Sequence, residues 1–200
     1  YRARRQRQMC IRDRDYTDLW AKLIEKKFRE FTSAHSLQDE DVLILYSAHS
    51  LPEAYCLEKG DRYNREIKGS IENIENSLKE LGLQHNHALG WQSKVGPKRT
   101  KWLTPSTPEV LERTKEKGLL IVPIAFTTDH IETLDEIDIE FREYVEDAGK
   151  LFSRADCFNL EDAFIQLCSK LVREHIAVSY ESSIRPCCEN CVGLDCAAMR

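Results

Sequence analysis

Apolar residues recur at helical spacing in two segments of this chain. From residue 16 to residue 31 they occur three or four positions apart among charged residues, which is typical of an amphipathic helix. The same spacing extends from Ile67 to Leu81, and Gly82 follows at the position that a glycine takes just after a helix end. A polar linker at residues 32–40 comes after the first segment. The pattern therefore predicts helices at 16–31 and 67–81.

Short apolar runs alternate with these helical segments. DVLILY at residues 41–46 and LLIVPIAF at 119–126 are long enough for buried strands, and shorter strands are expected at 88–92 and 151–155. Pro123 removes one backbone hydrogen-bond donor from the 119–126 run. Runs of this kind are typical of parallel strands that are covered on both faces.

Further helices are expected between the later strands. STPE at residues 106–109 offers a capping box with proline in the first turn, and the helix that it begins is predicted to end at Gly118. Two more helices are expected at 130–146 and 159–179, the second capped by NLED at 159–162. The order after residue 40 is then β-α-β-α-β-α-β-α. It predicts an α/β domain of the Rossmann type, with a mainly parallel sheet and helices on both faces.

Composition sets the class of protein. A chain of 200 residues with 42% hydrophobic content can bury a core. No window holds 18 uninterrupted apolar residues, which a membrane-spanning helix would need, and no secretory signal opens the chain. We therefore expect a bacterial cytoplasmic protein.

The first fourteen residues differ in charge from the rest. They hold six arginines and one acid, so the remaining residues carry most of the negative charge of a chain whose formal net charge is −5. A basic arm can bind nucleic acid or act as a transit peptide. RQRQMCIRDR at residues 5–14, however, resembles translated sequencing-adapter sequence. We interpret residues 1–14 as a non-native segment, expect no nucleic-acid partner, and expect the native protein to begin further upstream.

Histidine and carboxylate residues follow two of the predicted strands. YSAHSLP at residues 46–52 contains His49, and PIAFTTDHIETLDE at 123–136 contains His130 and Glu132. Ligand sites of open α/β sheets collect outside the carboxyl ends of the strands, so both segments are expected at one cleft. Imidazole and carboxylate can accept protons, and both can bind iron(II).

Five carboxylates continue from the second segment at spacings of three, four, four and three: Asp129, Glu132, Glu136, Glu140 and Glu143. On a helix they would form one stripe, along which a cation could pass. The alternative is a solvated helix face, which we favour for Glu140 and Glu143. Asp129 and Glu132 differ because they are expected in the first turn, beside the strand end.

Three segments in the same order resemble the ferrochelatase family: YSAHSLP, WQSKVGP at residues 91–97 followed by Trp102, and PIAFTTDHIETLDE. The resemblance begins near Asp41 and extends to the end of the chain. It implies an enzyme, a lyase, that inserts iron(II) into protoporphyrin to form haem. It assigns proton removal and metal contact to His49 and Glu132, and iron conduction along a helix with a π-type widening to His130, Asp129 and Glu136. Porphyrin contact falls to Ser50, Trp102 and Phe126.

Cysteines are concentrated at the carboxyl terminus. Cys188, Cys191 and Cys196 form a C-x2-C-x4-C hook, with Cys187 adjacent, whose spacing suits structural zinc or an iron–sulfur cluster. A tail with free thiols is the alternative. Some ferrochelatases carry a [2Fe-2S] cluster on such a hook, so the resemblance implies that cluster, with a fourth ligand outside this chain. Three other cysteines, Cys56, Cys157 and Cys168, are expected to be buried small hydrophobes.

These observations divide the chain into four parts. We expect the non-native segment at 1–14, a helix and linker from a preceding lobe at 15–40, the carboxyl-terminal α/β domain of a two-lobed enzyme at 41–180, and the cluster-binding tail at 181–200. The missing lobe would carry the opposite wall of the cleft, so the fragment alone is expected to be inactive.

Other functions stay open at this point. The same fold could insert iron into coproporphyrin or another metal into a related tetrapyrrole. A non-enzymatic two-lobed binding module and a zinc-hook nucleic-acid module are further alternatives. The resemblance also leaves a homodimer and peripheral membrane contact open.

Overall fold

The computed structural model describes residues 14–57, 59–94, 96–97 and 99–177. Its centre is a four-stranded sheet in which every neighbouring pair is parallel, as the sequence predicts. The strand order is β2-β1-β3-β4. The strands are β1 (Val42–His49), β2 (Asn86–Gln92), β3 (Gly118–Val122) and β4 (Leu151–Arg154).

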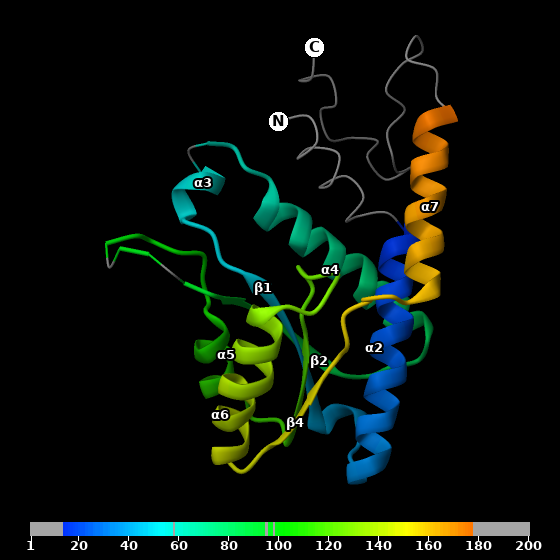
Figure 1. The fold of residues 1–200 in the computed structure, drawn as a ribbon. Helices are drawn as coiled ribbons and strands as arrows, with labels where there is room; N and C mark the ends of the chain where they lie inside the picture. Colours follow the sequence, from blue (N-terminus) through cyan, green and yellow to red (C-terminus); the bar gives the residue numbers. More distant parts are fainter. Residues whose placement is uncertain (1–13, 58, 95, 98, 178–200) are drawn as a thin grey trace.

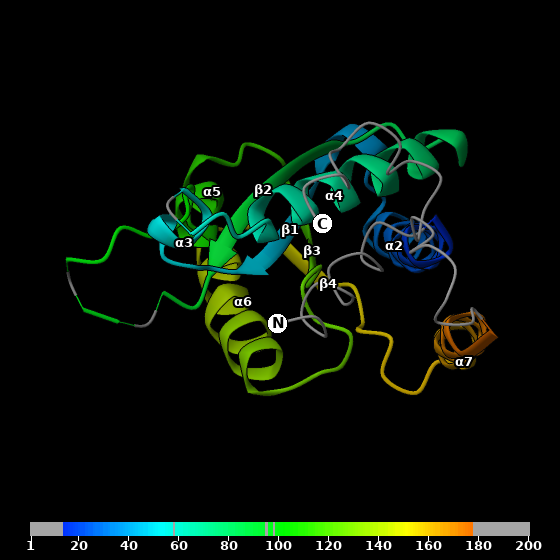
Figure 2. The same ribbon diagram turned by 90° about the horizontal axis from the view of Figure 1, so that it is seen from above.

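Helices cover both faces of this sheet (Figures 1 and 2). One face carries α2 (Arg14–His35) and α4 (Tyr63–Glu80), with α7 (Asp162–Ala177) beside α2. The other face carries α5 (Thr107–Arg113), the π-helix η2 (Glu132–Phe141) and α6 (Arg142–Asp147). Two short elements complete the fold, the 3-10 turn η1 (Asp39–Asp41) and α3 (Glu53–Leu57). None of the helices in the described ranges is long and apolar enough to cross a membrane.

Strand β1 divides the core in two because successive side chains of a strand point to opposite faces. Ile44 and Tyr46 are fully buried in the larger cluster, with the apolar side chains of α2 and α4. Leu43 and Leu45 belong to the smaller cluster, with Ile137 of η2. Both faces of β1 are thus covered, which explains its continuous apolar sequence.

The direction of the crossover connections reverses at β1. From β1 the chain crosses to β2 at one edge, and then returns past β1 to add β3 and β4 on its other side. In open α/β sheets the ligand crevice forms at such a reversal, outside the carboxyl ends of the strands. Here that point lies between the ends of β1 and β3.

Several element boundaries differ from the sequence prediction. His49 is the last residue of β1 rather than a residue beyond the strand, because its backbone pairs with Gln92 of β2. Strand β3 ends at Val122, since Pro123 has no N–H to donate to a neighbouring strand. The predicted helix end at Gly118 was wrong as well: α5 ends at Arg113.

Close packing explains why a glycine occupies position 118. Gly118 begins β3, where a Cβ atom would lie 2.9 Å from the Phe31 ring and 3.0 Å from Leu37. The predicted capping box at Ser106 is present, and Gly82 takes the predicted left-handed conformation after α4. The basic segment 1–14, apart from Arg14, and the predicted cysteine hook lie outside the described residues.

Candidate active site

The ends of β1 and of the segment after β3 meet through His49 and Glu132. Nδ1 of His49 lies 2.8 Å from Oε2 of Glu132, the first residue of η2. The two side chains are 39% and 33% exposed, so the pair is open to solvent while its orientation is fixed by the contact. The two residues to which the resemblance assigns proton removal are therefore in direct contact.

Glu136 lies one turn further along η2 and faces the end of β2. Its carboxylate accepts hydrogen bonds from the side chain of Gln92 at 2.9 Å and from the backbone N–H of Ser93 at 2.7 Å. The Ser93 hydroxyl also contacts Glu136, and it lies 3.4 Å from Oε2 of Glu132. Ser93 therefore links the two carboxylates of η2.

This network continues into the sheet. The Ser47 hydroxyl of β1 donates to the side-chain oxygen Oε1 of Gln92 at 2.5 Å, and it lies 3.0 Å from the hydroxyl of Thr107, the first residue of α5. All three side chains are buried. A buried polar network whose hydrogen bonds are satisfied holds its members in one arrangement. It therefore fixes the side chain of Gln92, which donates to Glu136.

The π-helix places the acidic residues differently from the single stripe that α-helical spacing predicts. A π-helix bonds each residue to the fifth one along, so its turn is wider than that of an α-helix. Glu132 and Glu136 contact the strand ends, whereas Glu140 and Glu143 are exposed, as we favoured for those two residues. The π-type widening expected from the resemblance is thus present at residues 132–141.

Asp129 lies in a separate cluster. Its carboxylate accepts hydrogen bonds from Arg154 at 2.9 Å and from Asn159 at 2.7 Å. Burial opposes ionisation of Asp129, but the Asn159 hydrogen bond and the Arg154 charge outweigh it and lower the pKa of this carboxyl. Asn159 therefore anchors Asp129, and does not cap α7 as predicted from the sequence.

The remaining predicted site residues surround the same strand ends. The His130 ring lies edge-on to Phe126, with 4.6 Å between centroids, and its Nδ1 faces the backbone N–H of Glu132 at 3.3 Å. Ser50 is fully buried directly after β1, and Trp102 pairs with Pro52 through an isolated bridge.

The family model described as Ferrochelatase matches residues 8–176. This chain belongs to the ferrochelatase family. A ferrochelatase of a Synechococcus species is 38% identical over 176 residues, which are 85% of this chain and 48% of that relative. The ferrochelatase of Synechococcus elongatus is 43% identical over 141 residues, 68% of this chain and 35% of the relative.

A plant protein is also similar. Ferrochelatase-1 of Arabidopsis thaliana, described as chloroplastic/mitochondrial, is 38% identical over 156 residues, which cover 76% of this chain and 32% of that protein. The chain thus spans between a third and a half of the length of these relatives. The family match includes residues 8–14, which belong to the basic segment predicted to be non-native.

Two residues of this candidate site, Gln92 and Ser93, were not named as site residues from the sequence. A signal was present, because Gln92 ends the second strand-like run of the chain, Ser93 follows it, and parallel neighbours end at the same edge of a sheet. Their polar side chains at the end of β2 are equivalent in position to His49 at the end of β1, with which Gln92 pairs.

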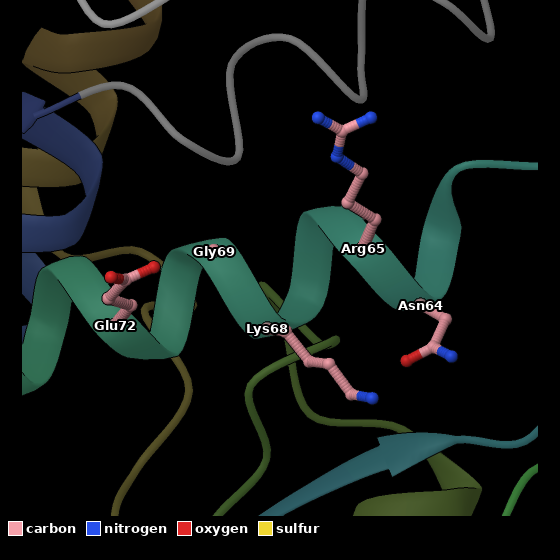
Figure 3. A pocket seen from close by; sticks show the side chains of 5 residues that line it. All are labelled: Asn64, Arg65, Lys68, Gly69 and Glu72. Carbon is pink, nitrogen blue, oxygen red and sulfur yellow. The ribbon is translucent and has the colours of Figure 1, made fainter.

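A surface hollow of this ferrochelatase chain lies along α4 (Figure 3). Its lining residues all come from one helix: Asn64, Arg65, Lys68, Gly69 and Glu72. Figure 3 shows Asn64 and Lys68 pointing to one side of the helix and Arg65 to the other, so the polar groups do not converge. This hollow contains neither His49 nor Glu132.

Proposed function

We propose that this chain supplies one wall of the active site of a ferrochelatase that inserts iron(II) into protoporphyrin. Family membership supports the reaction, and the contact between His49 and Glu132 supports the assignment of its proton acceptors. The reaction replaces two pyrrole N–H protons by one Fe²⁺ ion, with no change in oxidation state. An acceptor for each of the two protons is therefore the chemical requirement.

The His49–Glu132 pair can meet this requirement. Nδ1 of His49 faces the carboxylate, which leaves Nε2 to accept a proton from the macrocycle. The carboxylate stabilises the imidazolium that forms, and it can pass protons to solvent because it is one-third exposed. Either group can also bind the incoming iron(II).

The other predicted residues surround this pair in our proposal. Glu136 and His130 would guide iron(II) towards Glu132, and Asp129 would contribute to iron conduction from its separate cluster with Arg154 and Asn159. The porphyrin would contact Ser50, Trp102 and Phe126, which follow β1, precede α5 and follow β3 in the chain. A single wall of aromatic and polar groups leaves the opposite face of the macrocycle to the part of the enzyme that this chain lacks.

We further propose a [2Fe-2S] cluster on Cys188, Cys191 and Cys196, with a fourth ligand from outside the chain. The C-x2-C-x4-C spacing supports the proposal, and these residues lie outside the described ranges. A cytoplasmic location, a homodimer and peripheral contact with a membrane belong to the same proposal. Porphyrin is apolar enough to collect in membranes, which is the reason for expecting that contact.

Anaerobic insertion of iron(II) into protoporphyrin tests this proposal. The gene completed with the residues upstream of Asp15 would be assayed beside the 200-residue chain. Haem formation by the completed protein alone is the expected result, and haem formation by neither protein would contradict it. Assays with coproporphyrin and with cobalt(II) separate the alternative substrates, and tight porphyrin binding without turnover would favour a binding module.

A further inference from the structure

A second group of metal-ligating side chains lies on the face of the sheet that α2 and α4 cover. It consists of Glu75 on α4, His87 on β2 and His85 just before that strand. The His49–Glu132 pair involves η2, which packs on the opposite face. The two groups are thus built from different residues on different sides of β1.

The ligand atoms of this second group are already close to one another. Oε2 of Glu75 lies 3.2 Å from Nε2 of His85 and 3.1 Å from Nδ1 of His87, and one ligand atom from each residue lies within 4.8 Å of the other two. Zinc bonds of about 2.0–2.2 Å in tetrahedral geometry put neighbouring ligand atoms roughly 3.3 Å apart. A cation could therefore enter with small side-chain movements.

The surrounding structure orients the carboxylate. The fully buried Tyr46 of β1 donates its hydroxyl hydrogen to Oε1 of Glu75 at 2.7 Å. That bond fixes the carboxylate, as partners of metal ligands commonly do. Oε2 then lies near both imidazoles, and Nε2 of His85 is also 3.2 Å from Oε1. His85 and Glu75 have side chains that are 2% and 5% exposed, whereas His87 is 42% exposed. His85 and Glu75 are therefore shielded from solvent, and solvent reaches the group through His87.

We propose that Glu75, His85 and His87 bind a divalent cation of the zinc class, with a fourth position left for water. Two imidazoles and one carboxylate favour zinc, cobalt, nickel or copper over magnesium and calcium, which prefer oxygen ligands alone. The cation would bind the lone pair of one nitrogen of each ring, so a neutral ring would carry its proton on the other nitrogen, and a ring protonated on both nitrogens would release one proton to solvent. The cation would also join α4 to β2. This site does not depend on the proposed insertion of iron into porphyrin.

A purely structural role for the same residues is the competing explanation. Both imidazoles could donate an N–H to Glu75 and so satisfy a buried carboxylate without any cation. Nδ1 of His85 is buried and has no hydrogen-bond partner among the residues that the structure describes, so the carboxylate is the polar contact that holds this ring. The two explanations differ in whether the folded chain takes up a stoichiometric cation.

The test removes the other donors first. A background variant would carry His49→Ala and serine at Cys187, Cys188, Cys191 and Cys196. Equilibrium dialysis against zinc sulfate, followed by elemental analysis, should then give one zinc ion per chain. X-ray absorption should show a first shell of nitrogen and oxygen at about 2.0–2.2 Å. Absence of stoichiometric zinc in this background would overturn the proposal.

Two further substitutions and one control locate the ion. His87→Ala in this background should weaken zinc binding at least tenfold and abolish the rise in Tm that zinc gives. It alters a partly exposed residue, so the fold should persist by circular dichroism. Glu75→Gln keeps an acceptor for Tyr46 but removes the negative charge, and should weaken binding similarly. His35→Ala removes an exposed histidine of α2 and should change nothing. Binding by the His87→Ala chain that equals the background would overturn the assignment.

Discussion

Nδ1 of His49 and Oε2 of Glu132 are 2.8 Å apart although 83 residues separate them in the chain. The contact exists because β1 and β3 are parallel neighbours at the point where the strand order reverses. β1 ends in His49, and the segment after β3 leads into the π-helix that begins at Glu132. A histidine and a carboxylate at the ends of two neighbouring segments are thus held together within this chain.

Replacement of Glu132 by glutamine tests the chemical role of this contact. Glutamine keeps the volume and can still hydrogen-bond to His49, but it cannot carry the charge that stabilises an imidazolium. We expect kcat for iron insertion by the completed enzyme to fall about 100-fold or more, with porphyrin affinity unchanged. Stopped-flow measurement of haem formation and a fluorescence titration with porphyrin separate the two quantities.

Glu140→Gln is the matched control, because Glu140 lies on the same helix and is exposed. It removes one carboxylate without touching the strand ends, so kcat should stay within about twofold of the unaltered enzyme. Equal losses in both variants would show that the charge of the helix as a whole matters, and that Glu132 has no specific role.

Gly90 tests the packing that supports the Ser47–Gln92 network. A Cβ atom there would lie 2.7 Å from the Cα of Thr107, so the start of α5 would have to move away from β2. We expect Gly90→Ala to lower the free energy of unfolding by about 1–3 kcal/mol. Urea denaturation followed by circular dichroism measures the change.

Gly82→Ala provides the comparison for this prediction. A Cβ at Gly82 meets nothing within 4 Å, and its cost comes from a φ of +84° alone. That conformational cost is about 1 kcal/mol. If Gly90→Ala cost no more than Gly82→Ala, close approach of α5 to β2 would not limit the residue at position 90.

The sequence predicted the architecture better than the details of the site. Apolar runs identified the four strands, and apolar periodicity identified the helices of residues 14–35 and 63–80. The signal was clearest for β1, β3 and these two helices, because each buries a continuous run or stripe. The end of α5 was predicted wrongly, because Gly118, a glycine required for packing against Phe31, was interpreted as a helix end. The five-residue helix α3 was missed because a segment that short has no period to detect.

The spacing of residues in the sequence did not predict which side chains contact one another. Helical spacing put Asp129 and Glu132 in one stripe, but Asp129 turns to Arg154 and Asn159, which are supplied by later parts of the chain. Such pairings depend on tertiary contacts that residue spacing does not encode. The same holds for Glu75, whose histidine partners are His87 on β2 and His85 just before that strand.

Asp129 gives a prediction for the dependence of stability on pH. Its folded-state pKa is lowered, so its ionised form stabilises the fold above the ordinary carboxyl pKa of about 4, and this contribution is lost as the pH falls through the folded-state value. Asp129→Asn should therefore lower the free energy of unfolding at pH 7 by about 1–3 kcal/mol.

The difference between the variant and the original chain should shrink at pH 3, because the pH has then passed the ordinary carboxyl pKa and part of the stabilisation by the ionised form is lost. Urea denaturation at both pH values measures it. A difference that is equal at pH 7 and pH 3 would show that the Arg154–Asp129 ion pair does not stabilise the fold. Arg154 keeps Asp138 as a second partner in the variant, so the fold should survive the substitution.

Cys157 and Cys168 should differ in reactivity. Burial and the neighbouring Asp129 carboxylate raise the pKa of the Cys157 thiol to about 12, and its side chain is buried, whereas Cys168 is exposed on α7. Because the thiolate is the reactive form, iodoacetamide at pH 8 should label Cys168 long before Cys157. Peptide mapping of the native protein over time measures both rates, and equal rates would show that the segment around Cys157 opens readily.

The expectation of three small buried cysteines is therefore confirmed for Cys157 and wrong for Cys168. Cys56 is half-buried. α7 contacts α2 through one side, and Cys168 lies on the side that faces solvent, which the short apolar pattern of that helix did not reveal.

The proposed cluster gives the last prediction. Cys191 is the middle member of the C-x2-C-x4-C hook, and serine in its place keeps the size but removes the thiolate that an iron–sulfur cluster needs. In the completed protein, purified anaerobically, Cys191→Ser should abolish the visible absorbance of the cluster and its iron and sulfide content. Cys168→Ser removes an exposed cysteine from α7 and should leave both unchanged. Visible absorbance that persists in the Cys191→Ser protein would show that cysteines outside the hook hold the cluster.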